Sequence, residues 1–336
     1  MNELVTLAYG SGGKLTHQLI DDVFYHCFGN PLLLEGSDSA VFEVKSGKMA
    51  FTTDSYVISP IFFKGGNIGK LAVCGTVNDL AVCGACPKYI SCGFIIEEGF
   101  RIDELKSISE SMAETAKEAG VSIVTGDTKV VQKDGADRIF INTSGIGFVQ
   151  DEISLSAKKI KAGDKIIMSG TMGDHGAAIL LERENIKVQS DICSDCAPLN
   201  LMIEHVMKKF SYAIRVMRDP TRGGVATTLN ELIAGSNLSI QLFEESLPVR
   251  DEVKGICEML GMNPLYMANE GKVLIIADGT HAKSIVEVLK GSPYGKDATI
   301  IGTVTNDYPN KVLIRTFAGG NRIVDMLVGD QLPRIC

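Results

Sequence analysis

The chain has 336 residues, 45% of them hydrophobic and 22% charged, and its net charge of −8 disfavours non-specific binding to nucleic acid or acidic membranes. No stretch is apolar for the length that a bilayer requires, and the N-terminus lacks the basic and apolar segments of a secretion signal. Nine cysteines, an odd number without a small-domain framework, predict free thiols in a reducing compartment, so we expect a cytoplasmic protein.

A connector divides the chain into two halves that each alternate strands and helices. Residues 155–163 are rich in Lys, Ser and Gly and interrupt the pattern, so we place the boundary there. The length agrees, because single cores seldom extend beyond about 250–300 residues. We therefore predict an α+β protein with a first domain over 1–155, a second over 156–318 and a mobile tail over 319–336.

Hydrophobic periodicity and turn signals predict the elements in chain order. The first half is expected to contain a helix from Leu15, a hairpin of strands 39–45 and 48–54 around Ser46-Gly47, a helix over 67–84, a strand at 92–97, a helix from Asp103 to Gly120, and strands at 121–125 and 138–149. The second half is expected to contain strands at 165–169, 239–243, 272–277, 299–304 and 311–316, and helices at 175–184, 198–210, 224–234 and 282–289.

The first glycine-rich loop, Gly10-Ser11-Gly12-Gly13-Lys14, offers clustered backbone N–H groups and a lysine before a predicted helix. Such a loop suits phosphate oxygens. It is not a Walker A loop, because Leu15 follows the lysine where that motif requires Ser or Thr. Phosphate contact and a plain mobile turn therefore both stay open.

Four aspartates lie where apolar sequence predicts burial. Asp38 precedes a predicted strand, Asp54 ends one, Asp79 lies within an apolar helix and Asp127 follows a strand. Unpaired carboxylates in apolar surroundings are costly, so they require cations. Magnesium bridging a nucleotide triphosphate is the economical partner, although each aspartate alone is equally a cap or turn former.

Two CxxC pairs, Cys83 with Cys86 and Cys193 with Cys196, suggest zinc, but more than a hundred residues separate them. Cys83 belongs to an apolar helix, where a buried cysteine is common. Structural thiols are therefore favoured over a zinc site. His175, at a predicted strand-to-helix turn, is expected to cap the helix rather than to approach a ligand.

The chain ends in Pro333-Arg334-Ile335-Cys336, so a thiol stands on the last residue. A tail can carry a thiol into an active site and out again, which a core cysteine cannot do. Chance is the plain alternative, and prenylation requires the cysteine four residues from the end. Gly329 offers a hinge, and Pro333 keeps the last residues extended.

Together these motifs resemble the HypE family, the carbamoyl dehydratases of nickel–iron hydrogenase maturation. This family lies within the aminoimidazole ribonucleotide synthetase-like ATP-binding superfamily. Matching segments run almost from end to end, at 10–13, 53–57, 66–70, 78–79, 126–129, 173–176, 219–224 and 269–272. The terminal Pro-Arg-Ile-Cys separates the family from its superfamily relatives.

The resemblance implies a two-domain α+β fold in which the N-terminal domains pair into a homodimer with a barrel-like core, with ATP near that interface. It implies magnesium and phosphate ligands at Asp38, Asp54, Asp79 and Asp127, and further ATP-binding positions at Gly12, Gly13, Asn78, Asp219 and Arg222.

The resemblance also implies a reaction on the chain's own tail. A partner carbamoyltransferase places a carboxamide on Cys336, ATP activates the carboxamide oxygen by phosphorylation, and loss of phosphate leaves a thiocyanate. An iron-carrying scaffold complex of hydrogenase maturation then accepts the cyanide. The nitrogen must lose protons, so a base has to stand within hydrogen-bond reach of it. The family match gives this role to Glu270, with Lys129 as a charge-stabilising or proton-handling partner.

Two other functions stay open at this point. A kinase or synthetase of the same superfamily, acting on a free small molecule, would leave Cys336 dispensable. A thiol-rich scaffold would bind nucleotide and partners without turnover. Zinc content, and ATP hydrolysis with and without the modified tail, would distinguish these alternatives.

Overall fold

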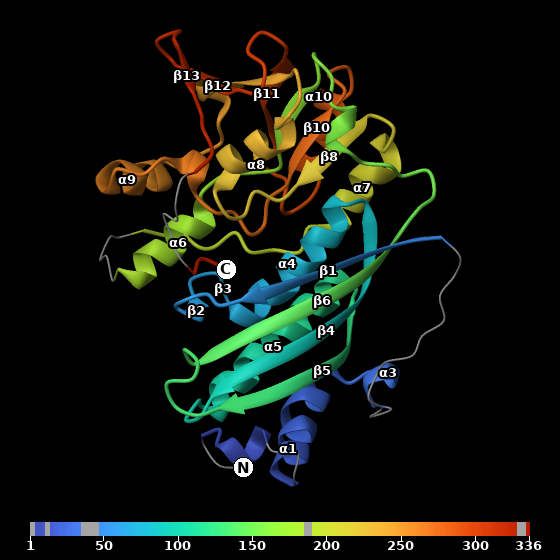
Figure 1. Cartoon of the computed structure of the whole chain (residues 1–336), viewed down its shortest axis with the longest axis vertical. Helices are drawn as coiled ribbons and strands as arrows, with labels where there is room; N and C mark the ends of the chain where they lie inside the picture. The colour runs from blue at the N-terminus through green and yellow to red at the C-terminus, as the bar shows by residue number, and fades with distance from the viewer. Residues whose placement is uncertain (1–3, 11–13, 35–46, 185–189, 328–333) are drawn as a thin grey trace.

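Two α+β domains lie one above the other along the long axis of the molecule, with the N-terminal domain at the bottom of Figure 1. The computed structural model describes residues 4–10, 14–34, 47–184, 190–327 and 334–336. Each domain is a sheet with helices packed on it, so the expected two-domain α+β architecture is confirmed.

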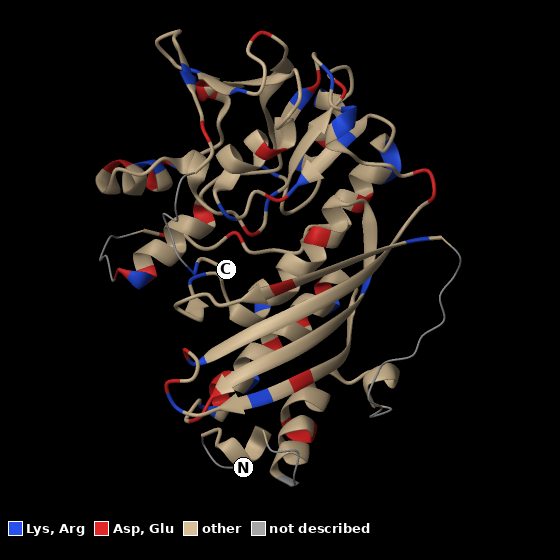
Figure 2. Cartoon of the chain, viewed as in Figure 1, with Lys and Arg blue, Asp and Glu red and all other residues tan. Residues whose placement is uncertain are grey.

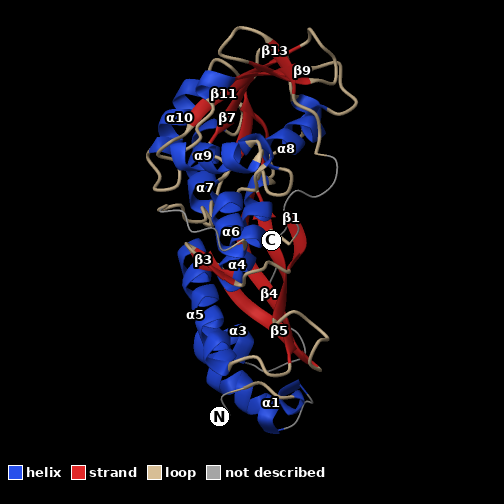
Figure 3. Cartoon of the chain, turned by 90° about the vertical axis from the view of Figure 1, so that its left-hand side faces the viewer, coloured by secondary structure: helices blue, strands red, loops and turns tan. Residues whose placement is uncertain are grey.

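The first domain is built on a four-stranded sheet. Its order is β1-β6-β4-β5, formed by Lys48–Tyr56, Ile139–Val149, Ala85–Glu97 and Ser122–Val131. Strand β6 pairs antiparallel with β1 and β4, and β4 pairs parallel with β5. Helices α4 (Ile68–Val82) and α5 (Ile102–Ala119) lie on the same side of this sheet (Figure 3). The two edge strands, β1 and β5, are therefore separated by the full width of the sheet.

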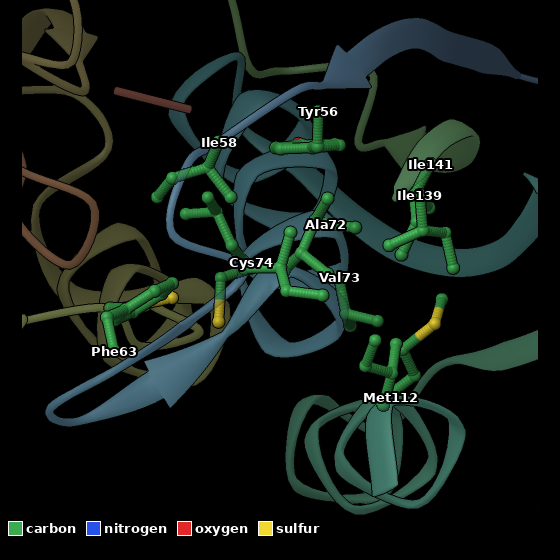
Figure 4. Packing of buried hydrophobic residues seen from close by; sticks show 14 of the residues in the cluster. Tyr56, Ile58, Phe63, Ala72, Val73, Cys74, Met112, Ile139 and Ile141 are labelled. Carbon is green, nitrogen blue, oxygen red and sulfur yellow. The ribbon is translucent and has the colours of Figure 1, made fainter. Parts of the chain in front are cut away.

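Helix α4 occupies the centre of the first domain. Its N-cap is Asn67, whose side chain accepts hydrogen bonds from two backbone N–H groups of the first turn. The helix is apolar on all sides because it packs against the sheet, α5 and α7, and Figure 4 shows Val73 between Tyr56 of β1 and Met112 of α5. A carboxylate in such a helix, Asp79, therefore needs a specific partner.

The second domain is built on a seven-stranded sheet. Its order is β13 (Asn321–Ile323), β12 (Val312–Arg315), β9 (Ser239–Phe243), β11 (Thr299–Thr305), β7 (Lys165–Met168), β10 (Leu274–Ala277) and β8 (Ile214–Arg218). Its helices are α6 (Asp174–Arg183), α7 (Asn200–Phe210), α8 (Gly224–Ile233), α9 (Asp251–Leu260) and α10 (Ala282–Lys290). Helix α7 also packs against α4, so it joins the two domains.

Short elements complete the described chain. The N-terminal ones are η1 (Leu7–Gly10), α1 (Lys14–Leu19), η2 (Ile20–Tyr25), α2 (His26–Phe28) and α3 (Pro31–Leu34). The others are β2 (Phe62–Phe63), β3 (Gly66–Asn67), η3 (Ala157–Lys159), η4 (Glu244–Ser246) and η5 (Pro264–Tyr266). None of the described helices is both long and apolar enough to cross a membrane.

Most predicted elements are present, but several boundaries differ. Strands β4 and β5 are longer than expected, so Asp127 lies within β5 rather than after a strand, and Asp54 lies within β1. Helix α5 begins at Ile102 after the N-cap Arg101, so Asp103, the predicted start of this helix, lies in its first turn and pairs with Arg101. Strands β8 and β13 and helix α9 were not predicted, and the predicted strand 39–45 lies outside the described residues.

Candidate active site

Four acidic side chains from both domains lie within electrostatic range of one another where the domains meet. They are Asp54 on β1, Asp79 on α4, Asp219 after β8 and Glu270 before β10. The charge of Asp54 raises the pKa of each of the other three, which places all four within electrostatic range. Figure 2 shows acidic positions on β1 and α4 and on the adjoining loops of the second domain.

Glu270 is the most deeply buried member of this group. Its backbone N–H donates to Asp195 Oδ1 at 3.0 Å, and its side-chain Oε1 has no hydrogen-bond partner among the described residues. Burial raises the pKa of Glu270 well above its ordinary value, and the nearby Cys196 and Asp219 raise it further. A buried carboxyl with an unused oxygen and a raised pKa has the properties of a group that accepts and returns a proton.

Asp79 and Asp219 also have raised pKa values. Burial raises the pKa of Asp79, against a 2.9 Å hydrogen bond that its Oδ2 accepts from Thr52 Oγ1. Burial and the charge of Asp79 raise the pKa of Asp219 to about 7. Carboxylates that repel one another in this way are stabilised by a divalent cation with oxygen ligands, so this donor set fits magnesium. Within the described residues, however, no three acidic, Cys or His side chains form a ready metal cluster.

Asp127 and Lys129 lie apart from this group. They are on β5, at the opposite edge of the sheet from Asp54, and both are exposed. Asp54 lies in register with Thr143, Cys92 and Gly126, so about 14 Å separates Asp54 from the β5 backbone. Asp127, one residue further along, points to the opposite face of the sheet. One chain therefore does not bring Asp127 to Asp54 and Asp79.

Lys129 and Asp127 instead pair with each other. Lys129 Nζ lies 2.8 Å from Asp127 Oδ1, and this partner holds the pKa of Asp127 below its ordinary value. The expectation that Asp127 is buried is wrong for the single chain, because a strand side chain on the uncovered face meets solvent. The remaining predicted ligands Gly12, Gly13 and Asp38 lie outside the described residues.

Asn78 and Arg222 border the acidic group. The side-chain oxygen of Asn78 accepts from the N–H of Leu199 at 2.8 Å, and its Nδ2 donates to the carbonyls of Ala197 and Glu270. Asn78 therefore ties α4 to the second domain and to the loop that carries Glu270. Arg222 is exposed, and its charge lowers the pKa of Asp79, so it faces the same group.

The last three residues lie between the two domains, where Figure 1 marks the C-terminus. The N–H groups of Val57 and Ser59 donate to the carbonyls of Cys336 and Arg334, at 3.1 and 3.3 Å. This alternation is that of an antiparallel strand pair, which continues directly from β1. Ile335 is only 5% exposed and Cys336 is half-buried. The backbone of Cys336 is therefore held beside Val57, directly after the end of β1, the strand that carries Asp54.

His175 holds this tail, a role that the sequence did not reveal. The helix N-cap is Gly173, so the expected capping role of His175 is wrong. The buried ring instead bonds Ser194 Oγ through Nδ1 and the carbonyl oxygen of Ile335 through Nε2, both at 2.8 Å. Burial lowers the pKa of His175. The turn around His175 is visible in the sequence, but its contact with the tail residue Ile335 is not.

The cysteines of the two CxxC pairs lie in different surroundings. Cys83 is exposed at the C-terminal cap of α4, contrary to the expected buried position, because the helix ends at Val82. Cys86 and Cys193 are also exposed, whereas Cys196 is buried and hydrogen-bonded to Cys74. The pairs therefore do not share a common environment.

The fold and the acidic group at the domain junction define a class of protein. Residues 36–149 match the family model of the AIR synthase related protein N-terminal domain, and residues 161–314 match that of the C-terminal domain. The chain thus has the AIR synthase-like fold. These two models cover the first sheet and all of the second except β13 and the end of β12.

Full-length relatives narrow the class. The chain is 50% identical to the carbamoyl dehydratase HypE of Bradyrhizobium diazoefficiens over 335 residues, covering 100% of this chain and 97% of that one. A crystal structure of HypE in complex with ATP superposes with a TM-score of 0.94 at 46% identity, covering 98% of this chain and 99% of that one. HypE in a HypE–HypF complex gives 0.81 at 49% identity, with 92% and 99% covered. The chain belongs to the HypE carbamoyl dehydratase family.

Proposed function

We propose that this protein dehydrates a carboxamide carried on its own Cys336 to a thiocyanate, using ATP, and so supplies the cyanide ligand of the hydrogenase iron. The observation that carries the proposal is the seating of Cys336 between the two domains, where its carbonyl accepts from Val57 just beyond β1, the strand that carries Asp54. A thiol placed there by its own backbone is a substrate already in position. Membership of the HypE family favours this function over turnover of a free small molecule.

The reaction is balanced by transfer of one phosphoryl group. The carboxamide oxygen on Cys336 receives the γ-phosphoryl group, which converts a poor leaving group into a good one and releases ADP. The C–O bond then breaks, phosphate departs, and the nitrogen gives up its protons to leave a carbon–nitrogen triple bond. Glu270 is the base for this nitrogen, because its buried Oε1 has no hydrogen-bond partner in the part of the chain that the structure describes. The net change on the tail is the loss of one water.

ATP and magnesium fit the residues on each side of the junction. Bound magnesium neutralises phosphate charge, and the repelling carboxylates of Asp54, Asp79 and Asp219 supply oxygens for it. A crystal structure of a HypE relative in complex with ATP supports ATP as the nucleotide. Asp127 and Lys129 would join them only from a second copy of the chain, because within one chain they lie at the far edge of the sheet.

A second copy would also cover an apolar surface. Met49, Phe51 and Ile95 lie on the sheet face that α4 and α5 leave uncovered, with 54%, 65% and 44% of their surfaces exposed. Such a group is unfavourable in water and is typical of an interface. We infer that two first domains pair through these faces into a barrel-like core.

The dimer predicts the effect of a charge on this face. Phe51→Glu should shift the protein from dimer to monomer, because a buried unpaired carboxylate is costly. Mg–ATP turnover should fall with it, since Asp127 and Lys129 no longer reach the partner's junction. Light scattering with chromatography measures the mass. Phe317→Glu, at a 79% exposed position of the second domain, is the matched control, and an unchanged dimer in both variants would contradict the proposal.

The metal site predicts a loss of nucleotide binding. Asp79→Asn and Asp127→Asn should fold normally but bind Mg–ATP at least about tenfold more weakly, because a neutral amide does not balance the cation charge. Calorimetry measures the affinity. Asp151→Asn, on an exposed turn, is the control. Unchanged affinity in both Asp79→Asn and Asp127→Asn would exclude these carboxylates as magnesium ligands.

Two partners follow from the reaction. A HypF-type carbamoyltransferase would place the carboxamide on Cys336, which the HypE–HypF complex of a relative supports, and an iron-carrying scaffold complex would accept the cyanide. The nine free cysteines support a reducing, cytoplasmic location. The test is intact mass: incubation with the carbamoyl donor should add one carboxamide, and Mg–ATP should then remove one water. A loaded protein that keeps its mass with Mg–ATP would overturn the proposal.

A further inference from the structure

The second CxxC segment, Cys193-Ser194-Asp195-Cys196, has its two middle side chains turned into the domain junction. We propose that this turn positions both reacting groups, with Ser194 acting through His175 on the substrate tail and Asp195 holding the backbone of Glu270. The inference rests on the proposed function, because it takes Cys336 as the substrate site and Glu270 as the base. It assigns Ser194, Asp195 and His175 as positioning residues.

The tail arm is a chain of hydrogen bonds with a fixed direction. The N–H of Cys196 donates to Ser194 Oγ at 3.1 Å, and Ser194 Oγ lies 2.8 Å from His175 Nδ1. The carbonyl oxygen of Ile335, 2.8 Å from Nε2, can only accept, so Nε2 carries the proton. In the neutral ring Nδ1 then accepts from the Ser194 hydroxyl. Ser194 thereby selects the tautomer that grips the residue next to Cys336.

The base arm uses both oxygens of one carboxylate. Asp195 Oδ1 accepts the N–H of Glu270 at 3.0 Å, and Oδ2 pairs with Lys272 Nζ at 3.0 Å. The Asp195 and Lys272 side chains are only 3% and 10% exposed, so this ion pair is desolvated and depends on its geometry. The loop 270–272 is therefore fixed at two points to the same aspartate.

Close backbone contacts fix the positions of the tail arm and the base arm relative to each other. A Cβ atom on Gly271 would lie 1.7 Å from the carbonyl oxygen of Asp195, so only glycine lets the base loop approach the turn this closely. On the other side, the N–H of Ser194 donates to the carbonyl of Lys64 at 2.8 Å, and Gly65 lies against the Ser194 backbone. A displacement of the turn would consequently shift the tail and the base together.

The tail arm is tested on full-length protein already loaded with the carboxamide, so that loading and dehydration are separated. His175→Phe should slow single-turnover loss of water by about tenfold or more, because small misplacements of a reacting group cost that much. His175→Gln, whose amide N–H reaches the same carbonyl, should recover most of the rate. Ser194→Ala, which removes a single hydroxyl, replaces His175→Phe if that variant does not fold.

Alkylation of unloaded Cys336, followed by mass spectrometry of the C-terminal peptide, reports the tail directly. The labelling rate should rise about fivefold in Ser194→Ala, as expected for loss of one hydrogen bond. In His175→Gln, it should stay close to the rate of the protein without substitutions. Cys193→Ser is the matched control from the same turn, because its side chain is exposed and bonds the carbonyl of Asp191.

The base arm requires a different pair of variants. Asp195→Ala should lose about a hundredfold in the dehydration rate without changing alkylation of Cys336. Asp195→Asn combined with Lys272→Met keeps an acceptor for the Glu270 N–H without a buried unpaired charge, so it should recover within about tenfold. A purely structural role would not produce this recovery.

The outcomes separate this inference from the proposed function. If the loaded unmodified protein does not lose water with Mg–ATP, the proposed function fails. If it does lose water, but the His175, Ser194 and Asp195 variants match Cys193→Ser in rate and labelling, the positioning turn is wrong.

Discussion

Glu270→Gln is expected to bind Mg–ATP as the unmodified protein does, and to dehydrate the carboxamide on Cys336 at least about a hundredfold more slowly. The amide keeps the shape of the side chain but does not accept a proton from the carboxamide nitrogen. Binding should survive because the carboxylates that suit magnesium include Asp54 and Asp79, which the substitution leaves in place. Single-turnover mass spectrometry measures the rate.

The same variant should be at least as stable as the unmodified protein near neutral pH. Burial raises the pKa of Glu270. Above the ordinary pKa of a glutamate, the unfolded chain has released this proton, so folding must either take it up again or bury the ionised carboxylate. This cost is absent below the ordinary pKa of a glutamate and grows as the pH rises above it. Gln removes it, so a slow but stable variant excludes misfolding as the cause.

Glu287→Gln on α10 is the matched control, because its carboxylate is exposed and its ion-pair partner is Lys290 of the same helix. If Glu270→Gln retains the full rate, Glu270 is not the base and Lys129 or solvent takes that role. A loss of ATP binding instead would place Glu270 among the nucleotide ligands.

The sequence predicted most of the fold because its elements bury one face each. Helix α10 and strand β9 follow regular apolar periods, so their predicted and observed limits nearly coincide. Strand β8 was missed because charged residues, Arg215 and Arg218, interrupt its short apolar pattern. Arg215 is paired with Asp164 and Asp278, which local periodicity does not reveal. The domain division near residue 155 stays a prediction.

The candidate site was predicted by residue type but not by position. Asp54, Asp79 and Glu270 lie on three elements far apart in the chain, and their common location depends on how the two domains meet. Asp127 looked equivalent to them in sequence, yet strand order places it at the other edge of the sheet. Periodicity indicates which face of an element is buried, but not the order of the strands in a sheet or how two domains meet.

The positioning residues were missed for a related reason. His175 and Ser194 become significant only through the carbonyl of Ile335, which is 160 positions from His175. The CxxC spacing drew attention to the sulfur atoms, whereas the structure turns Ser194 and Asp195 inward and leaves Cys193 exposed. The CxxC motif is defined by its two cysteines, so it gives no indication of the roles of the two residues between them.

Cys336→Ala is expected to abolish covalent modification completely while leaving fold, dimer and Mg–ATP binding intact. The tail is held by backbone groups, since Val57 and Ser59 bond the carbonyls of Cys336 and Arg334, and His175 bonds that of Ile335. None of these bonds uses the sulfur. Replacing a half-buried terminal thiol by a methyl group therefore costs little packing, and the variant tail should still enter the junction.

This variant separates the reacting atom from the arm that carries it. Tandem mass spectrometry of the protein without substitutions should place the carboxamide, and after Mg–ATP the nitrile, on the C-terminal peptide alone. Cys193→Ser should be loaded and dehydrated normally, because that exposed thiol lies outside both arms of the turn. Modification of Cys83, Cys86 or Cys193 in Cys336→Ala would show that the donor selects exposed thiols rather than the tail. In that case the docked C-terminus is a structural strand, and the substrate lies elsewhere.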